Sequence, residues 1–114
     1  MSQRRSRRAL TGRRARAILF AALGDETRLQ LLARLASGRQ YSIAELTEGS
    51  ALTRQAITKH LRVLERAKIV HGIRRGRENL FAFDPRPLQP AREYLDHVSE
   101  QWDQALARLK AFVE

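Results

Sequence analysis

The sequence predicts a mainly helical domain that carries one small β-hairpin. Two observations support this prediction. Apolar residues recur at helical spacing through most of residues 13–67 and again after residue 88. Between residues 69 and 83 the pattern changes to the short, alternating runs that are typical of paired strands. With 114 residues, the chain is expected to form one domain with about five helices and a two-stranded hairpin.

The chain is expected to divide into a short arm and a folded domain. Residues 1–12 are predicted to be a disordered basic arm, because they are rich in Arg and Ser and have few apolar side chains to bury. Residues 13–114 are predicted to form the domain, and its first helix is expected over about 13–23. Side chains suited to cap the next three helices are Asp25, Ser42 (with Glu45 completing a capping box) and Thr53.

The second half of the domain is predicted to contain the hairpin and a long last helix. Residues 69–73 and 79–83 read as the two strands, and Arg-Arg-Gly-Arg at 74–77 reads as the turn between them. Three prolines, at 85, 87 and 90, precede or open a helix expected over about 88–112. A short helix, a turn with Gly49, a longer helix over about 54–67 and this hairpin together predict a winged helix-turn-helix.

The charge indicates a polyanionic partner. The formal net charge is +10, and it is concentrated in two blocks. Residues 1–16 carry seven arginines and no acid, and residues 53–86 carry nine bases against three acids. Such an excess favours nucleic acid, or less often an anionic membrane surface, as the partner.

Several classes of protein are excluded by what the sequence lacks. It has no Cys, so disulfides and thiolate metal sites are excluded. It has no apolar run long enough to span a membrane and no secretion signal, so we expect a cytoplasmic protein. It has no HExxH, glycine-rich phosphate loop or nucleophile–His–carboxylate set, so we expect no enzyme and no cofactor.

The helix over 54–67 has the chemistry of a DNA recognition helix. A helix fits the major groove of B-DNA, where Arg reads guanine, Gln reads adenine and a Thr methyl contacts thymine. We expect base contacts near the start of the helix, phosphate contacts further along it, and groove or backbone contacts from the hairpin tip. The residues expected in these three roles are Arg54, Gln55 and Thr58; Lys59, His60 and Arg62; and Arg74, Arg75 and Arg77. His60 adjoins the buried stripe, so a local hydrogen bond is the alternative to a phosphate contact.

The last helix carries an apolar seam. Apolar residues from Ala91 to Phe112 alternate spacings of four and three, which is a heptad pattern. Either the seam packs on its own domain, or it forms a homodimer interface together with the first helix. A dimer would place two recognition helices about 34 Å apart, which matches a palindromic site. The residues expected at the centre of the interface are Leu95, Val98, Trp102 and Leu109.

Three stretches carry a family resemblance. Residues 24–32, Gly-Asp-Glu-Thr-Arg-Leu-Gln-Leu-Leu, resemble a signature of the ArsR family of bacterial regulators, written LGDPTRLxIL. Residues 53–64 resemble that family's recognition helix, and residues 70–83 resemble its wing. The resemblance implies a dimer with five helices and a wing that binds palindromic operators in double-stranded DNA and usually represses transcription. It also implies a bacterial cytoplasmic protein, associated with the nucleoid when bound to DNA.

The sequence departs from the family in its metal sites and at one backbone position. The stretch 41–46, where founding members sense metals through Cys, has none, and the last helix has only His97. No metal is therefore expected, as in a metal-free subgroup. Lys68 stands where the family often has Gly, and a left-handed backbone there would cost up to about 1 kcal/mol.

Three alternatives to a dimeric repressor remain open. A basic arm also suits a nucleoid-type protein that coats DNA uniformly, or an RNA-binding module. A winged helix that binds a protein partner would keep the fold but lack basic side chains on the exposed face of the recognition helix. For the arm itself, a passive solubilising tail is the alternative to phosphate binding by Arg4 to Arg16.

Overall fold

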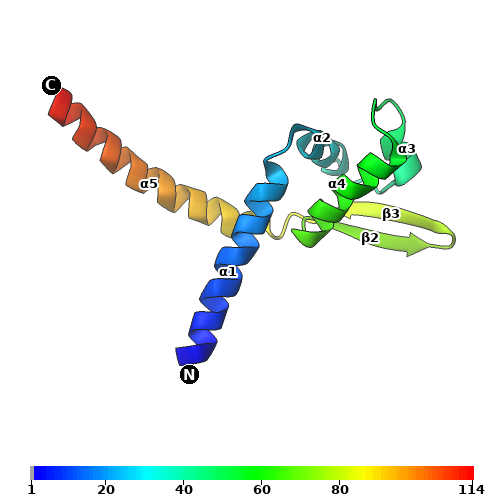
Figure 1. Ribbon diagram of the computed structural model, residues 1–114, viewed down its shortest axis with the longest axis horizontal. Coiled ribbons are helices and arrows are strands. Elements are labelled where there is room, and N and C mark those ends of the chain that lie inside the picture. The colour runs from blue at the N-terminus through cyan, green and yellow to red at the C-terminus, as the bar shows by residue number, and fades with distance from the viewer. Residues whose placement is uncertain (1) are drawn as a thin grey trace.

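A computed structural model describes the backbone of residues 2–114 and the side chains of residues 12–114. Five helices and a hairpin are present in this part of the chain, as predicted (Figure 1). The order of the elements is α1 (Ser2–Leu23), α2 (Glu26–Leu35), β1 (Tyr41–Ser42), α3 (Ile43–Thr47), α4 (Arg54–Arg66), β2 (Val70–Arg75), β3 (Glu78–Phe83) and α5 (Leu88–Val113).

The first helix begins earlier than predicted. The structure extends α1 back to Ser2, whereas the sequence predicts a helix from about residue 13 preceded by an arm. Arg, Ala, Leu and Gln, which dominate this segment, are all strong helix formers, so local propensity agrees with helix. The side chains of residues 1–11 lie outside the described part of the chain, and the behaviour of the arm stays a prediction.

Two of the three predicted N-caps are confirmed. The Ser42 hydroxyl accepts from the Glu45 backbone N–H at 3.1 Å, and the Glu45 carboxylate accepts from the Ser42 N–H at 3.0 Å, which completes the capping box of α3. This backbone hydrogen bond from Ser42 is the main reason that the pKa of Glu45 lies below its usual range. The Thr53 hydroxyl accepts from the Ala56 N–H at 3.1 Å and caps α4.

The third predicted cap, by the side chain of Asp25, is not formed. Asp25 occupies the N-cap position of α2 with an extended backbone, but its side chain makes no capping hydrogen bond. Its carboxylate lies 3.9 Å from both Arg28 and His60 instead. The two cationic or polar neighbours compete with the helix N–H groups for the carboxylate.

The sheet has three strands rather than the predicted two. Its order is β1-β3-β2, and both pairs are antiparallel. Tyr41 of β1 pairs with Phe81, which extends the hairpin on the free edge of β3. A strand of two residues carries no periodic signal, so the sequence could not predict it.

The hairpin turn is tighter than predicted. Arg75 pairs with Glu78, which leaves only Gly76 and Arg77 in the loop. Gly76 has φ +60°. Glycine suits the first central position of a two-residue hairpin turn because that position requires a positive φ.

The core lies where α2, α3, α4 and the sheet meet. Its members come from every helix except the far part of α5, and each is less than one-tenth exposed. The largest side chains that are fully buried are Leu35, Leu46, Ile57, Leu61, Leu64, Ile69 and Val70. Truncating one such Leu or Ile to Ala typically costs about 2–5 kcal/mol.

Arg28 ties the end of α1 to α4. Its guanidinium donates to the carbonyls of Ala22 at 2.7 Å and Ala21 at 3.2 Å, which lie in the last turn of α1. It also lies 3.3 Å from His60 Nδ1 on α4. One side chain therefore satisfies the helix end and joins two helices.

A second polar joint anchors the base of the hairpin. The Asp84 carboxylate is 8% exposed and lies between His71 on β2, at 2.6 Å from Nε2, and the guanidinium of Arg86, at 2.7 Å. The backbone N–H of Arg86 also donates to it at 3.0 Å. The hydrogen bonds from Arg86 are the main reason that the pKa of Asp84 lies well below its usual range. This joint fixes the segment between β3 and α5.

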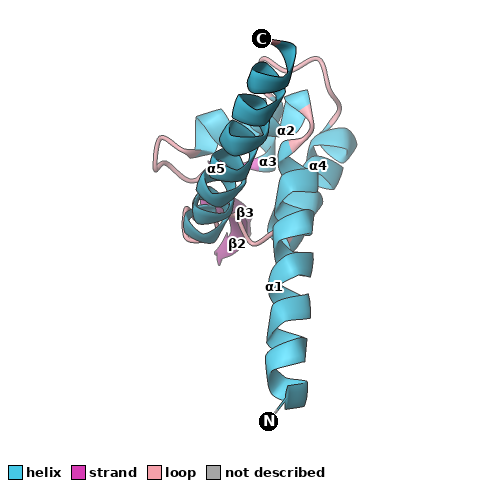
Figure 2. Cartoon of the chain, turned by 90° about the vertical axis from the view of Figure 1, so that its left-hand side faces the viewer, coloured by secondary structure: helices cyan, strands magenta, loops and turns pink. Residues whose placement is uncertain are grey.

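The last helix projects away from the core (Figure 1). A helix of 26 residues is about 39 Å long, more than half of the molecule's longest dimension of 61 Å. Its first turns are held by the buried Ala91 and by Tyr94, whose ring is 6.0 Å from that of Phe20. Figure 2 shows α1 and α5 leaving the rest of the domain in different directions.

Lys68 has the left-handed backbone considered from the sequence, with φ +64°. We expect Lys68→Gly to raise the free energy of unfolding by up to about 1 kcal/mol, because glycine adopts this φ without a Cβ penalty. Urea unfolding at fixed protein concentration measures the change. Gly38→Ala is the converse control, since Gly38 has φ +91° in open space and should lose stability. A destabilised Lys68→Gly would contradict the expectation.

Asp84 should make stability depend on pH. Its folded pKa lies below the value of about 3.9 in an unfolded chain, so its contribution is fully present above that value and is lost as the pH falls below it, through the lower folded pKa. We expect Asp84→Asn to lower stability at neutral pH and to flatten its decline between about pH 5 and pH 2. Urea unfolding across this range measures both effects. Asp103→Asn, which removes an exposed carboxylate of α5, controls for the loss of one negative charge.

Candidate nucleic-acid interface

Helix α4 buries one side and exposes the other. Ile57, Leu61 and Leu64 are at most 1% exposed and face the core. Since residues three and four apart share a face, one exposed stripe runs down the opposite side. The members of this stripe are Gln55, Lys59, Arg62 and Arg66.

Arg66 was not among the residues predicted from the sequence. It lies four residues after Arg62 and seven after Lys59, and it is exposed. Helical spacing alone could have identified it. Arg62 pairs with Glu65 at 3.0 Å on the surface, an interaction worth roughly 0–1 kcal/mol, so the pair adds little to stability and little hindrance to other contacts.

Thr58 presents its methyl group rather than its hydroxyl. The Thr58 hydroxyl donates to the carbonyl of Arg54 at 2.7 Å, one turn back along α4. This bond uses the only donor of the side chain. The side chain is half-buried, and its remaining chemistry is that of an apolar methyl, the group suited to thymine.

The start of α4 and the hairpin tip face a common cavity. Arg54 and Arg77 both line a cavity of about 260 Å³, together with Glu78 and Asn79 of β3 and with residues 42–44 at the start of α3. The structure therefore brings together two arginines that are 23 positions apart in the sequence. The start of α4 and the hairpin tip therefore each contribute one arginine to this cavity, beside the carboxylate of Glu78.

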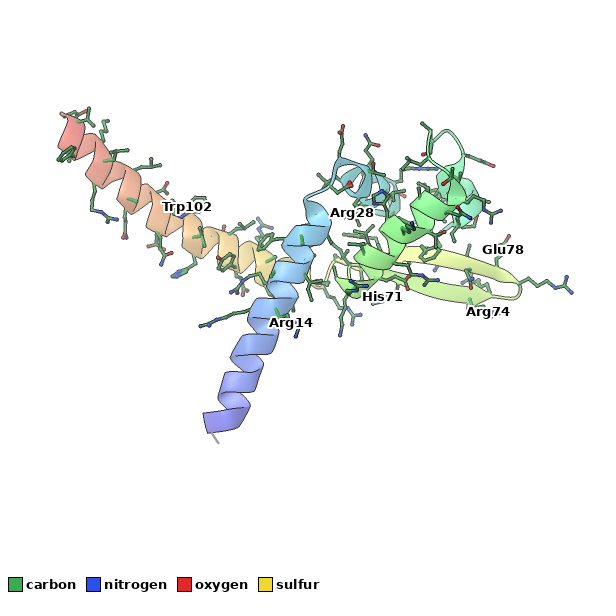
Figure 3. The ribbon with its side chains drawn as sticks, in the orientation of Figure 1. Arg14, Arg28, His71, Arg74, Glu78 and Trp102 are labelled. Carbon is green, nitrogen blue, oxygen red and sulfur yellow. The ribbon has the colours of Figure 1, made fainter. Side chains whose placement is uncertain are left out.

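The three hairpin arginines do not form a single cluster. Arg74 pairs with Asn79, on the same face of the sheet as Val70 and Gly72, whereas Arg75 pairs with Glu78 on the other face. Figure 3 shows Arg74 and Glu78 on opposite sides of the hairpin. Arg77 extends from the turn itself. The predicted triplet is therefore spread around the tip, and all three side chains are exposed.

His60 lies apart from the other predicted residues. Its Nδ1 is 3.3 Å from Arg28 and 3.9 Å from the Asp25 carboxylate, between α4 and the start of α2. This is the local hydrogen bond that the sequence offered as the alternative to a phosphate contact. The sequence could not identify Arg28 as its partner because the two residues are 32 positions apart.

The apolar seam of α5 faces solvent in the single chain. Ala91, at its start, is 5% exposed, but Leu95 is 49% exposed and Trp102 is 66% exposed. The alternative that the seam packs on its own domain therefore holds only for the first turn. Leu106 and Val113, which the predicted seam did not include, widen the exposed apolar face.

Neither a cluster of metal ligands nor a membrane-spanning helix is present among the described residues. Within them, no group of three or more His, Asp and Glu side chains comes together as a metal site would require. In the same residues, no helix is long and apolar enough to cross a membrane.

Comparison with known proteins agrees with this geometry. The helix-turn-helix domain family matches residues 23–73. An HTH-type transcriptional regulator of Bacillus subtilis, YuzN, is 39% identical over 77 residues, which cover 62% of this chain and 84% of the relative. The regulator Rv2034 of Mycobacterium tuberculosis is 34% identical over 87 residues, which cover 76% of this chain and 78% of the relative.

A solved structure extends the likeness to the whole fold. An ArsR-like transcriptional regulator from Rhodococcus sp. RHA1 superposes with a TM-score of 0.74 at 34% identity, over 88% of this chain and 91% of that one. The sequence-based predictions of a winged helix-turn-helix and of a regulator rather than an enzyme are confirmed by this match and by the matched relatives. The chain belongs to the ArsR family of helix-turn-helix transcriptional regulators.

Proposed function

We propose that this regulator is a homodimeric repressor that binds a palindromic operator in double-stranded DNA. The observation that carries the proposal is the placement of Arg54, at the start of α4, and Arg77, at the hairpin tip, on one shared cavity. The helix start can enter the major groove while the hairpin follows the neighbouring backbone or minor groove.

Two kinds of contact divide the interface. Arg54, Gln55 and Thr58 lie at the leading end of α4 and are assigned to base edges. Exposed cations further along the helix and around the tip are assigned to phosphates, which bind any sequence. This second set consists of Lys59, Arg62, Arg66, Arg74, Arg75 and Arg77, with Arg4 to Arg16 adding weaker contacts.

A homodimer accounts for the exposed face of α5. Trp102, Leu109 and Phe112 are 66%, 58% and 89% exposed, and contiguous apolar surface of this kind marks an interaction site. A second copy of α5, with support from α1, offers a matching apolar seam. Two-fold symmetry would then present two copies of α4 to the same side of a duplex, one helical turn apart.

The regulator is proposed to work without a bound metal and in the cytoplasm of a bacterium. The sequence has no Cys, and His97 is the only His on α5. Three or four ligands from Cys, His and acidic residues would be needed for a transition-metal site. This part of the proposal places the chain in a metal-free subgroup of its family.

Substitutions should separate base contacts from phosphate contacts. We expect Gln55→Ala to weaken operator binding by about 1–3 kcal/mol with little effect on a scrambled duplex. Arg77→Ala should weaken both and reduce the salt dependence by about one phosphate contact. Titrations at several salt concentrations on both duplexes measure this. If Gln55→Ala weakens binding to the operator and to the scrambled duplex equally, specificity would be assigned to the hairpin. If the wild type coats both duplexes uniformly, a nucleoid-type protein would be favoured.

The dimer depends on the α5 seam in this proposal. Trp102→Ala should weaken dimerisation by roughly 3 kcal/mol, because it removes a large aromatic from the centre of the interface. Sedimentation equilibrium over a range of concentrations measures the dissociation constant. Glu100→Ala is the matched control, since Glu100 lies on the opposite side of α5. A wild-type chain that sediments as a monomer at micromolar concentration would contradict the dimer.

Metal should have no effect on DNA binding. We expect the same operator affinity in excess zinc and in the presence of a chelator. A reproducible tenfold difference corresponds to about 1.4 kcal/mol of coupling and would show that the regulator has a metal site.

A further inference from the structure

An apolar cavity lies where α1, the end of α4 and the start of α5 meet. Its volume is about 300 Å³, at the small end of the roughly 300–1,000 Å³ that ligand pockets occupy. Leu19, Ala67 and Ala91 supply its buried walls, and Pro87 and Pro90 close the side formed by α5. Of the residues that line this cavity, only Arg16 is also among those assigned to DNA phosphates.

A second cavity adjoins the first. It has a volume of about 220 Å³ and shares Ala15, Ala67 and Lys68 with the first cavity. Lys68 therefore stands at the border of both. Arg16 lines the first cavity, and Arg14 and Arg66 line the second. Figure 3 shows Arg14 on α1 close to where α5 begins.

The cations around this junction lack acidic partners. Among the described residues, no carboxylate lies within 4.0 Å of the charged groups of Arg14, Arg16, Arg66 or Lys68, and none lines either cavity. Arg16 is positioned over the ring of Tyr94 at 3.9 Å. Apolar walls beside uncompensated positive charge suit a molecule with an apolar body and an anionic end.

Lys68 is also the one non-glycine residue with a positive φ in the described part of the chain. A left-handed backbone is unfavourable for a lysine, and the Lys68 side chain is exposed. This backbone ends α4: the Lys68 N–H donates to the Glu65 carbonyl at 2.9 Å and the Ile69 N–H donates to the Leu64 carbonyl at 3.3 Å. The helix end therefore accounts for the conformation, and it leaves the charged side chain at the edge of the cavity.

We propose that the cavity binds a small amphipathic carboxylate, whose charged end pairs with Lys68 and whose hydrocarbon chain packs between Leu19, Ala91 and the prolines of α5. A chain of about eight carbons suits a cavity at the small end of the ligand range. Lys68 connects α4 to β2, and the cavity is walled by α5. This consequence rests on the proposed function, in which α4 and the hairpin bind DNA and α5 forms the dimer. The ligand would then bias the angle between α4 with the hairpin and α5.

Calorimetric titration of the full chain with octanoate, in the absence of DNA, tests the proposal. We expect saturable binding of one octanoate per chain, at least tenfold weaker binding to Lys68→Gln, and none to Ala15→Trp, which fills the cavity from the exposed side of α1. Lys68→Gln removes the charge but keeps a flexible polar side chain and the left-handed backbone position. Lys110→Gln is the matched control on α5 and should bind as the wild type does. Octylamine, with the opposite charge, should not bind.

Several results would overturn the proposal. These are the absence of saturable octanoate binding, equal binding of octylamine, or equal losses in Lys68→Gln and Lys110→Gln. If octanoate fails to bind while Lys68→Gln weakens duplex binding, the cations serve the DNA backbone. If it fails to bind while Ala15→Trp dissociates the oligomer, a second copy of the chain covers the cavity. Circular dichroism checks that each variant is folded. If Ala15→Trp does not fold, octanoate binding by Lys68→Gln decides the test. Because no DNA is present, a failure of the proposed DNA binding leaves this test unaffected.

Discussion

The burial of Ile57, Leu61 and Leu64 fixes how α4 is rotated about its own axis, and the interface depends on that rotation. Each of these side chains is at most 1% exposed, so turning the helix would expose apolar surface at a cost of about 1.5–3 kcal/mol per side chain. Gln55 and Lys59 lie outward because these three residues lie inward. The surface offered to DNA is thus a consequence of the core.

The other functional elements take their positions from α4 through short connections. Only Lys68 and Ile69 separate the helical C-cap from β2, and Ile69 and Val70 are themselves buried, so the hairpin cannot swing freely. At the base of the hairpin, Asp84 links His71 and Arg86 and so fixes the start of the segment that leads to α5. Two links of this kind, one covalent and one electrostatic, join the helix, the hairpin and the proposed dimer helix.

The features of the fold that could be predicted from the sequence are those with local causes. The caps by Ser42 and Thr53, the hairpin and the start of α5 follow from patterns within a few residues. The joints made by Arg28 and Asp84 could not be predicted in full, because their histidine partners His60 and His71 lie 32 and 13 positions away and leave no periodic trace. For the candidate site, exposure of the α4 residues followed from helical spacing. The separation of Arg74 from Arg75 was available in principle, since neighbours in a strand point to opposite faces.

The distribution of charge is consistent with one molecule that must both bind a polyanion and pair with its own copy. A net charge of +10 opposes association of two chains, since like charges repel across an interface. Residues 87–114, however, carry three bases against five acids, a net charge of −2, so the helix with the exposed seam contributes little to that repulsion. The positive charge lies instead on α1, α4 and the hairpin. Because α5 carries no excess positive charge, its apolar face can associate with a second copy while the surface proposed to bind DNA stays basic.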